Sequence, residues 1–200
     1  MTRILAIDTS SAWCSVALSL PDAAPLVRHQ KVSAGASQLL LPWVQELLSE
    51  ASIELSSLDG IAIGIGPGAF TGVRLGVAAV QGLAIAARLP VLPVASLDAI
   101  ASQLIKTPEF ISSGAQSFVI AVDARMGEVY WASYRVMTDQ LPERLGDIHL
   151  TAPESIELKN IKFLAGSAIA EFGNRLFACV SQPFASSHLD SVIGVNALGV

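Results

Sequence analysis

Residues 60–88 read GIAIGIGPGAFTGVRLGVAAVQGLAIAAR, and this stretch decides the fold class. Residues 60–65 form a short, continuously apolar run, which predicts a buried strand. The glycine-rich loop 66–70 follows, and Thr71 is placed to cap a helix over residues 72–88. A buried strand that leads through such a loop into a helix is typical of an α/β fold.

The alternation of strands and helices continues on both sides of this segment. Upstream, we expect strands at 3–8, 13–20 and 26–32, the third more exposed, and an amphipathic helix at 36–51. Downstream, we expect a strand at 91–95, a helix at 96–105 and a linker at 106–116. A second set of elements then follows, with strands at 117–123, 128–136, 142–150 and 161–166 and a helix at 167–177. Because the apolar strands 4–8 and 119–123 both end in aspartate, the pattern suggests a duplicated α/β unit.

The composition limits the classes of partner. Hydrophobic residues make up 52% of the chain and charged residues only 14%, so part of the apolar surface is expected to be covered by another protein. The net charge is −5 and no basic run occurs, which argues against binding a nucleic-acid backbone without help. Cys14 and Cys179 have no zinc or CxxC spacing and are expected to be buried thiols. The chain lacks a signal-peptide pattern and a long apolar run, so we expect a cytoplasmic protein outside the membrane.

Two segments could carry polar chemistry in the first half of the chain. The turn Asp8-Thr9-Ser10 could place an acid beside a metal or a phosphate, or could satisfy its own backbone. Gly66 and Gly68 lie in a loop whose N–H groups could hold an anion at the start of the next helix. That loop lacks the GK[ST] of a Walker A motif, so it could equally be a structural loop.

The helix predicted over 72–88 carries no charge from Leu75 to Ala87, and small residues recur along it. A helix that is apolar all round is covered on every face, either by its own domain or by a second protein. In the second half of the chain, Asp123, Arg125 and Glu128 crowd one predicted hairpin. They are candidate contacts for a nucleotide, for RNA or for one another.

The histidines and serines indicate no catalytic centre. His29, His149 and His188 are isolated, and neither HExxH nor HxxxH occurs, so a helix-borne metal pair is not expected. The nucleophile motif GxSxG is absent as well. We expect no metal and no cofactor.

Three segments together resemble the TsaB (YeaZ) family: ILAIDTSSAWCSVAL, GPGAFTGVRLGVAAVQGLA and VDARMGEVYWASY. The resemblance covers residues 3–135 well and the remainder loosely. It implies an α/β fold of the actin-like class (acetate kinase–Hsp70–actin, ribonuclease H-like), with two similar subdomains of mixed sheet plus helices. These subdomains are expected at 1–106 and 107–200, the second without the family's final segment.

The resemblance also implies a function. Members of the family are non-catalytic partners of TsaD, which transfers a threonylcarbamoyl group to N6 of adenosine 37 in tRNA. The implied partners are a TsaD-like catalytic subunit, a TsaE-like ATPase and a second copy of the chain as a homodimer, with tRNA bound through the complex. Two alternatives to this function are an independent ATPase or small-molecule kinase of the same fold and, with less support, a glycoprotease-type metallopeptidase.

The resemblance assigns residues to these roles. Its dimerisation helices correspond to 36–51 and 72–88, which gives as interface residues Leu40, Trp43, Val44, Leu47, Phe70, Arg74, Gly76, Ala79, Gly82 and Leu83. A degenerate nucleotide site would comprise Asp8, Thr9, Gly66, Gly68 and Asp123, and Arg125 and Glu128 are the candidate RNA or cleft contacts. Besides lacking the final segment, the chain departs from the family at the start of the first helix, where Ala36-Ser37 stand in place of a common His-Ser pair.

Overall fold

The computed structural model describes residues 2–32, 35–137, 140–156, 158, 161–177 and 185–186, so Cys179 and His188 lie outside the described residues. The described residues form two compact units that divide after Ala99. The predicted division between residues 106 and 107 lies further along the chain. Because the observed division falls inside helix α3 (Ser96–Leu104), the chain passes from one unit to the next within a helix.

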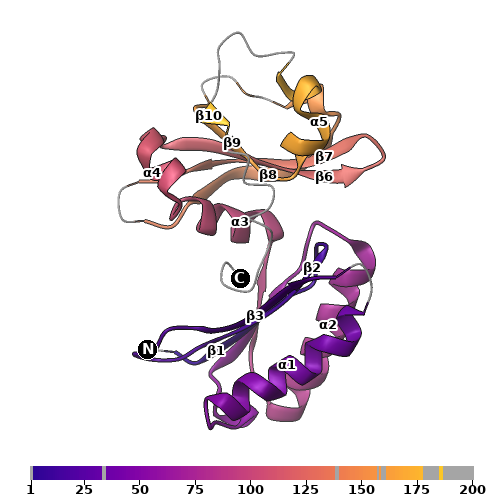
Figure 1. Cartoon of the computed structure of the whole chain (residues 1–200), viewed down its shortest axis with the longest axis vertical. Coiled ribbons are helices and arrows are strands. Elements are labelled where there is room, and N and C mark those ends of the chain that lie inside the picture. Colours follow the sequence, from indigo (N-terminus) through magenta and orange to yellow (C-terminus); the bar gives the residue numbers. More distant parts are fainter. Residues whose placement is uncertain are drawn as a thin grey trace. The chain divides into compact units, whose positions relative to one another are not determined.

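The first unit contains a five-stranded mixed sheet (Figure 1). Its strands are β1 (Ile4–Asp8), β2 (Trp13–Ser19), β3 (Leu26–Lys31), β4 (Gly60–Gly64) and β5 (Val91–Val94). They lie in the order β3-β2-β1-β4-β5, with β1, β2 and β3 antiparallel and β1, β4 and β5 parallel. The strands predicted from the sequence are confirmed, and β1 is central because its Ile7 pairs with both Val16 and Ile63.

Two helices cover one face of this sheet, α1 (Ala36–Glu50) and α2 (Phe70–Ala87), and a short 3-10 turn, η1 (Leu55–Ser57), precedes β4. Alternate strand residues such as Leu5 and Ile7 point into the core that these helices close. The predicted cap at Thr71 is wrong. Helix α2 begins at Phe70 after Ala69, and the backbone N–H of Val73 already donates to the Ala69 carbonyl at 2.9 Å.

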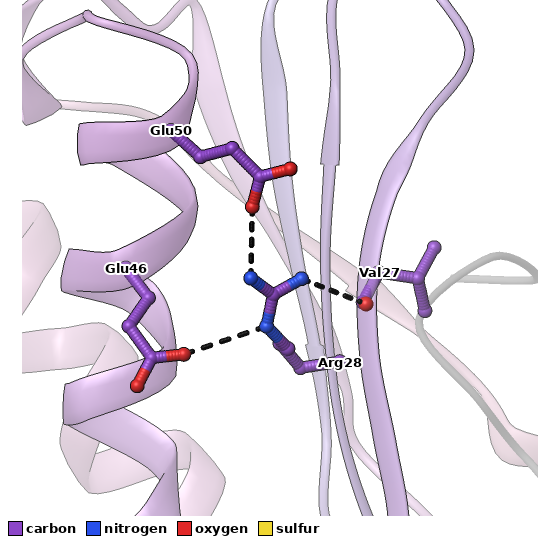
Figure 2. A network of polar contacts seen from close by, with 4 residues as sticks. All are labelled: Val27, Arg28, Glu46 and Glu50. Atoms are coloured by element: carbon purple, nitrogen blue, oxygen red, sulfur yellow. Dashed lines mark hydrogen bonds and ion pairs between the residues drawn. The ribbon is translucent and has the colours of Figure 1, made fainter.

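An ion-pair network joins the edge strand β3 to the polar side of α1 (Figure 2). Arg28 Nη2 lies 2.8 Å from Glu50 Oε2, and its Nε lies 3.4 Å from Glu46 Oε2. The third guanidinium nitrogen donates to the Val27 carbonyl. Hydrogen bonds to both carboxylates raise the pKa of Arg28 above its ordinary value. The network lies on the polar side of α1, the side that the sequence pattern predicted to face solvent.

The second unit repeats the topology of the first. Its strands are β6 (Ser117–Arg125), β7 (Glu128–Arg135), β8 (Glu143–Thr151), β9 (Phe163–Ala165) and β10 (Ala185–Ser186). They lie in the order β10-β9-β6-β7-β8, with β6 to β8 antiparallel and β9 and β10 parallel to β6. The predicted actin-like α/β class, with two similar subdomains of mixed sheet plus helices, is confirmed.

Helices lie on the second sheet as well. Helix α5 (Ala168–Phe177) and the 3-10 turn η2 (Pro153–Ser155) cover one face, where Ile169 and Leu176 are buried. The predicted linker at 106–116 is wrong, because it contains helix α4 (Pro108–Ser113). Thr107 caps this helix by accepting from the Phe110 N–H at 3.3 Å. The Phe110 ring also packs edge-on against Phe118 and Phe163, and these contacts hold the helix to the sheet.

Candidate functional site

The β1–β2 turn holds a buried carboxylate at its start. Asp8 has no exposed surface, and its Oδ1 accepts hydrogen bonds from the Ser10 N–H and the Ser10 hydroxyl, both at 2.9 Å. The Ser96 hydroxyl donates in turn to Ser10 Oγ at 3.0 Å. The other carboxylate oxygen, Oδ2, is buried and has no hydrogen-bond partner. One carboxylate oxygen therefore accepts two hydrogen bonds, and the other accepts none.

Burial shifts the ionisation of this cluster. Desolvation raises the pKa of Asp8 from 3.8 to about 6, although the two hydrogen bonds from Ser10 act in the opposite direction. Cys14, on the next strand, is also buried, as predicted. Desolvation, together with the negative charge of Asp8, raises the pKa of its thiol to about 11. This thiol is therefore protonated and poorly nucleophilic.

The segment that follows β4 is packed backbone to backbone against this turn. A Cβ atom added to Gly64 would lie 1.7 Å from Asp8 Oδ2, and one added to Gly68 would lie 2.1 Å from the Ser10 carbonyl oxygen. A Cβ added to Gly72 would lie 1.9 Å from the Thr9 carbonyl oxygen. These glycines serve close approach, because any side chain would force the turn and the segment apart.

Hydrogen bonds complete the attachment. The Thr9 hydroxyl donates to the Gly72 carbonyl at 2.7 Å, and the Ala69 N–H donates to the Ser10 carbonyl at 2.6 Å. The Ser96 N–H donates to the Gly66 carbonyl at 2.8 Å. We call this assembly of turn, loop and Ser96 the glycine lock. Apart from Asp8 Oδ2, the polar groups named here bond to one another within the first unit.

Four of the five residues predicted for a degenerate nucleotide site meet in the glycine lock. Asp8 and Thr9 are buried there, and Gly66 (φ 87°) and Gly68 belong to the loop. Asp123 belongs to the second unit. The nucleotide site stays a prediction, and in the first unit its central carboxylate is covered by the chain itself.

Among the described residues of its unit, helix α2 has one buried side and one exposed side. Its inner side carries the buried residues Gly76, Val80 and Ala84, which pack toward the sheet. Its opposite side, which we call the α2 outer face, consists of exposed residues: Phe70, Arg74, Ala78, Gln81, Gly82, Ile85 and Ala86. Phe70 is 68% exposed and Ile85 is 79% exposed. Arg74 lies over the Phe70 ring at 3.8 Å and carries the only charge of this face.

The apolar length of α2 has an explanation in this packing. Among the described residues, α2 alone is long and apolar enough to cross a membrane by length and composition. The residues on its inner side pack against the sheet, and Gly76 lies directly against Thr9 and Ile63. The outer face is the part of the helix that the described residues of its unit leave exposed.

The predicted interface residues fall into three groups. Exposed on the α2 outer face are Phe70, Arg74 and Gly82. Partly buried against the core are Trp43, Ala79 and Leu83. Fully buried are Leu40, Val44, Leu47 and Gly76. The buried group stabilises the unit itself, so the interface prediction now rests on the exposed group.

Several exposed residues were not among those predicted. Leu41 on α1 is 51% exposed, and Gln81 and Ile85 extend the α2 outer face. The positions 70, 74, 78, 81 and 85 follow one another at helical steps, a spacing that could have identified this stripe. Glycines also recur at every fourth residue from Gly64 to Gly76, and this spacing could have identified the glycine lock.

The candidate contacts Arg125 and Glu128 are both exposed, and they are opposite residues of the β6 and β7 strands at the turn that joins them. Asp123 Oδ1 accepts from the Arg125 N–H at 2.7 Å, and its Oδ2 lies 3.2 Å from the Arg125 guanidinium. The Asp123 N–H donates to Ser167 Oγ at 3.1 Å. One of the alternatives expected from the sequence was that these residues pair with one another. An ion pair between Arg125 and Asp123 is present.

Within the part of the chain that the structure describes, no group of three or more His, Cys, Asp or Glu side chains is arranged to hold a metal ion. His29 stacks on Trp13 with ring centroids 4.5 Å apart, and His149 lies 4.7 Å from the Trp131 ring. Both histidines therefore have aromatic contacts that account for their positions.

The sequence of the chain matches known proteins over most of its length. A family model described as TsaD, tRNA N6-adenosine threonylcarbamoyltransferase, matches residues 29–194. The chain is 41% identical over 133 residues to the tRNA threonylcarbamoyladenosine biosynthesis protein TsaB of Escherichia coli (strain K12), which covers 66% of this chain and 55% of that protein. It is 38% identical over 135 residues to TsaB of Haemophilus influenzae, covering 64% and 52%. The chain thus spans about half the length of the curated relatives it matches.

Solved structures give a longer match. YeaZ from Pseudomonas aeruginosa is 35% identical with a TM-score of 0.84, and the alignment covers 100% of this chain and 88% of that one. A second structure with the same values is described as an uncharacterized protein with similarity to peptidase YEAZ from the same organism. The similarity therefore includes both units.

Proposed function

We propose a function from the family of this chain, which belongs to the TsaB (YeaZ) family and matches the TsaD family model. It is the non-catalytic partner subunit in N6-threonylcarbamoylation of adenosine 37 of tRNA. It works by binding a TsaD-type catalytic subunit, and a TsaE-type ATPase joins the assembly. The same surface pairs two copies of the chain when the catalytic subunit is absent. The assembly acts in the cytoplasm, and tRNA is bound by the complex rather than by this chain alone.

The observation that carries the proposal is the α2 outer face. Seven exposed positions on one helix include a single charge, whereas the exposed side of α1 carries Glu46 and Glu50. Exposed apolar surface of this kind is characteristic of protein interfaces, with small residues that allow a partner helix to approach closely. The small residues Ala78, Gly82 and Ala86 supply that approach beside the larger Ile85.

The buried carboxylate supports a non-catalytic role. Asp8 is the acid that an ATPase of this fold would need beside its metal and phosphates, and here it is enclosed by Ser10 and Gly64. An independent ATPase or kinase would require the glycine lock to open. A peptidase activity would require a set of metal ligands or an activated nucleophile. The described residues contain no group of three metal-binding side chains, and the sequence contains no GxSxG nucleophile motif. On this proposal the TsaD-type partner carries out catalysis.

The test is reconstitution with the TsaD-type subunit of the same organism. We expect a stable heterodimer by size-exclusion chromatography with light scattering, and formation of threonylcarbamoyladenosine only when both chains are present. No complex, together with ATP hydrolysis by this chain alone, would overturn the proposal.

A matched pair of variants locates the interface. Ile85→Glu places a charge at the most exposed large apolar residue of the α2 outer face and is expected to weaken heterodimer formation about tenfold or more. Ile111→Glu makes the same change on α4, where Ile111 is 66% exposed, and serves as the control. Equal binding by both variants would show that another surface makes the contact.

A further inference from the structure

The loop that joins β6 to β7 has an unusual backbone. Arg125 pairs with Glu128, so only Met126 and Gly127 form the connection. Both have positive φ, 54° and 81°, as a two-residue hairpin with a primed turn requires. Arg125 also has positive φ, 68°. Among the described residues, this is the only place where two consecutive non-glycine residues adopt that conformation.

The residue types do not suit this conformation. The first central position of such a turn favours asparagine, aspartate or glycine, and a methionine there strains the backbone. Strain of this kind persists where the surrounding structure enforces it, and such positions concentrate at functional sites. By this criterion asparagine would suit the position better than the methionine found there.

The surroundings hold the tip in place. Asp123 binds both the backbone and the guanidinium of Arg125, and its own N–H is tied to Ser167 at the start of α5. Arg175 of α5 reaches within 3.9 Å of the position that a Cβ on Gly127 would occupy. Arg175 is in turn paired with both carboxylate oxygens of Glu154. The hairpin is thus held by the bonds of Asp123 to Arg125 and Ser167, while the Met126 side chain is 98% exposed.

We propose that the tip of this hairpin is a docking element, in which Met126 enters an apolar pocket on a protein partner while Arg125 contacts polar groups at the pocket's rim. A protein suits the tip better than RNA does. The projecting group is an unbranched apolar side chain, which adapts to apolar pockets. The Arg125 charge is already paired with Asp123, and the net charge of −5 disfavours a phosphate backbone.

This inference rests on the proposed function, so the probe is the TsaD-type catalytic subunit, titrated calorimetrically with the full chain. The variant Met126→Asn removes the apolar side chain and supplies the residue that the turn prefers. We expect its melting temperature to equal that of the wild type or to exceed it by up to about 2 °C. We expect its affinity for the catalytic subunit to fall about tenfold or more. Met137→Asn, at a methionine that is 53% exposed in the same unit, should bind like the wild type.

Each other outcome overturns the inference. A clear loss of melting temperature in Met126→Asn would make Met126 a structural residue. Wild-type affinity of that variant, or an equal loss in Met137→Asn, would remove the specific contact. Normal binding of the catalytic subunit with weaker binding of tRNA by the complex would assign the tip to RNA. If the wild type itself forms no complex, the proposed function fails and this inference fails with it.

Discussion

Replacing Gly72 by alanine is expected to destabilise the first unit, whereas the same replacement at Gly82 in the same helix is expected to stabilise it. The added Cβ at Gly72 would lie 1.9 Å from the Thr9 carbonyl oxygen, and ordinary contact begins at 3.4 Å. The difference, 3.4 − 1.9 = 1.5 Å, has to come from movement of backbone on both sides. At Gly82 nothing lies within 4 Å of the added atom.

These distances set the magnitudes. Overpacking in a core costs about 1–3 kcal/mol, and loss of the hydrogen bond from the Thr9 hydroxyl to the Gly72 carbonyl adds about 1 kcal/mol. Gly72→Ala should therefore lower the free energy of unfolding by about 2–4 kcal/mol. Gly82→Ala removes a glycine from an exposed helix interior and should raise it by up to about 1 kcal/mol.

Urea unfolding followed by tryptophan fluorescence measures both values. The chain has 3 tryptophans, and Trp13 and Trp43 lie in the first unit. In a Trp131→Phe background, the fluorescence therefore reports that unit alone. Opposite shifts of the urea midpoint are expected for the two variants. Shifts of the same sign, or a Gly72→Ala midpoint equal to that of the parent, would refute the packing argument.

Three further predictions concern charge and reactivity. Folding raises the pKa of Asp8 from 3.8 to about 6, so its contribution to stability is fully present below pH 3.8 and is lost as pH rises to about 6. The free energy of unfolding of Asp8→Asn, relative to that of the wild type, should rise by about 3 kcal/mol between pH 3.8 and about 6 and stay constant at higher pH. A difference that does not change with pH would contradict this. In a Cys179→Ser background, buried Cys14, with its pKa raised to about 11, should react with Ellman's reagent only after denaturant is added, and rapid native labelling would contradict its burial. Arg28→Gln should change the urea midpoint little, because the pairs with Glu46 and Glu50 are exposed; a large loss would give the network a structural role.

Periodicity predicted most of the fold because burial selects residue types along each element. The strand-loop-helix unit around Gly60–Gly64 and the amphipathic pattern of α1 are examples. Helix α4 was missed although Thr107, Pro108 and Gly114 mark its start and end. It has only 6 residues, too few for an amphipathic period, so only its capping residues could have indicated it.

The candidate site was less accessible to prediction from sequence. Leu40 and Ile85 are both apolar residues on amphipathic or apolar helices, yet one is 1% exposed and the other 79%. The residue type does not say whether an apolar stripe faces its own sheet or a partner, since that depends on where the sheet lies. The burial of Asp8 likewise depends on Gly64, which is distant in sequence and adjacent only after β1 and β4 pair.

The glycine lock also constrains the order in which the first unit can fold. The hydrogen bond from Thr9 to Gly72 closes a span of 63 residues, whereas β1, β2 and β3 are joined by short turns. Closing a long loop costs entropy that only later contacts offset, so the local strands can form early and the lock forms late. Contacts made after the transition state affect the unfolding rate more than the folding rate. We therefore expect substitutions at the glycines of the lock to raise the unfolding rate of the first unit more than they lower its folding rate.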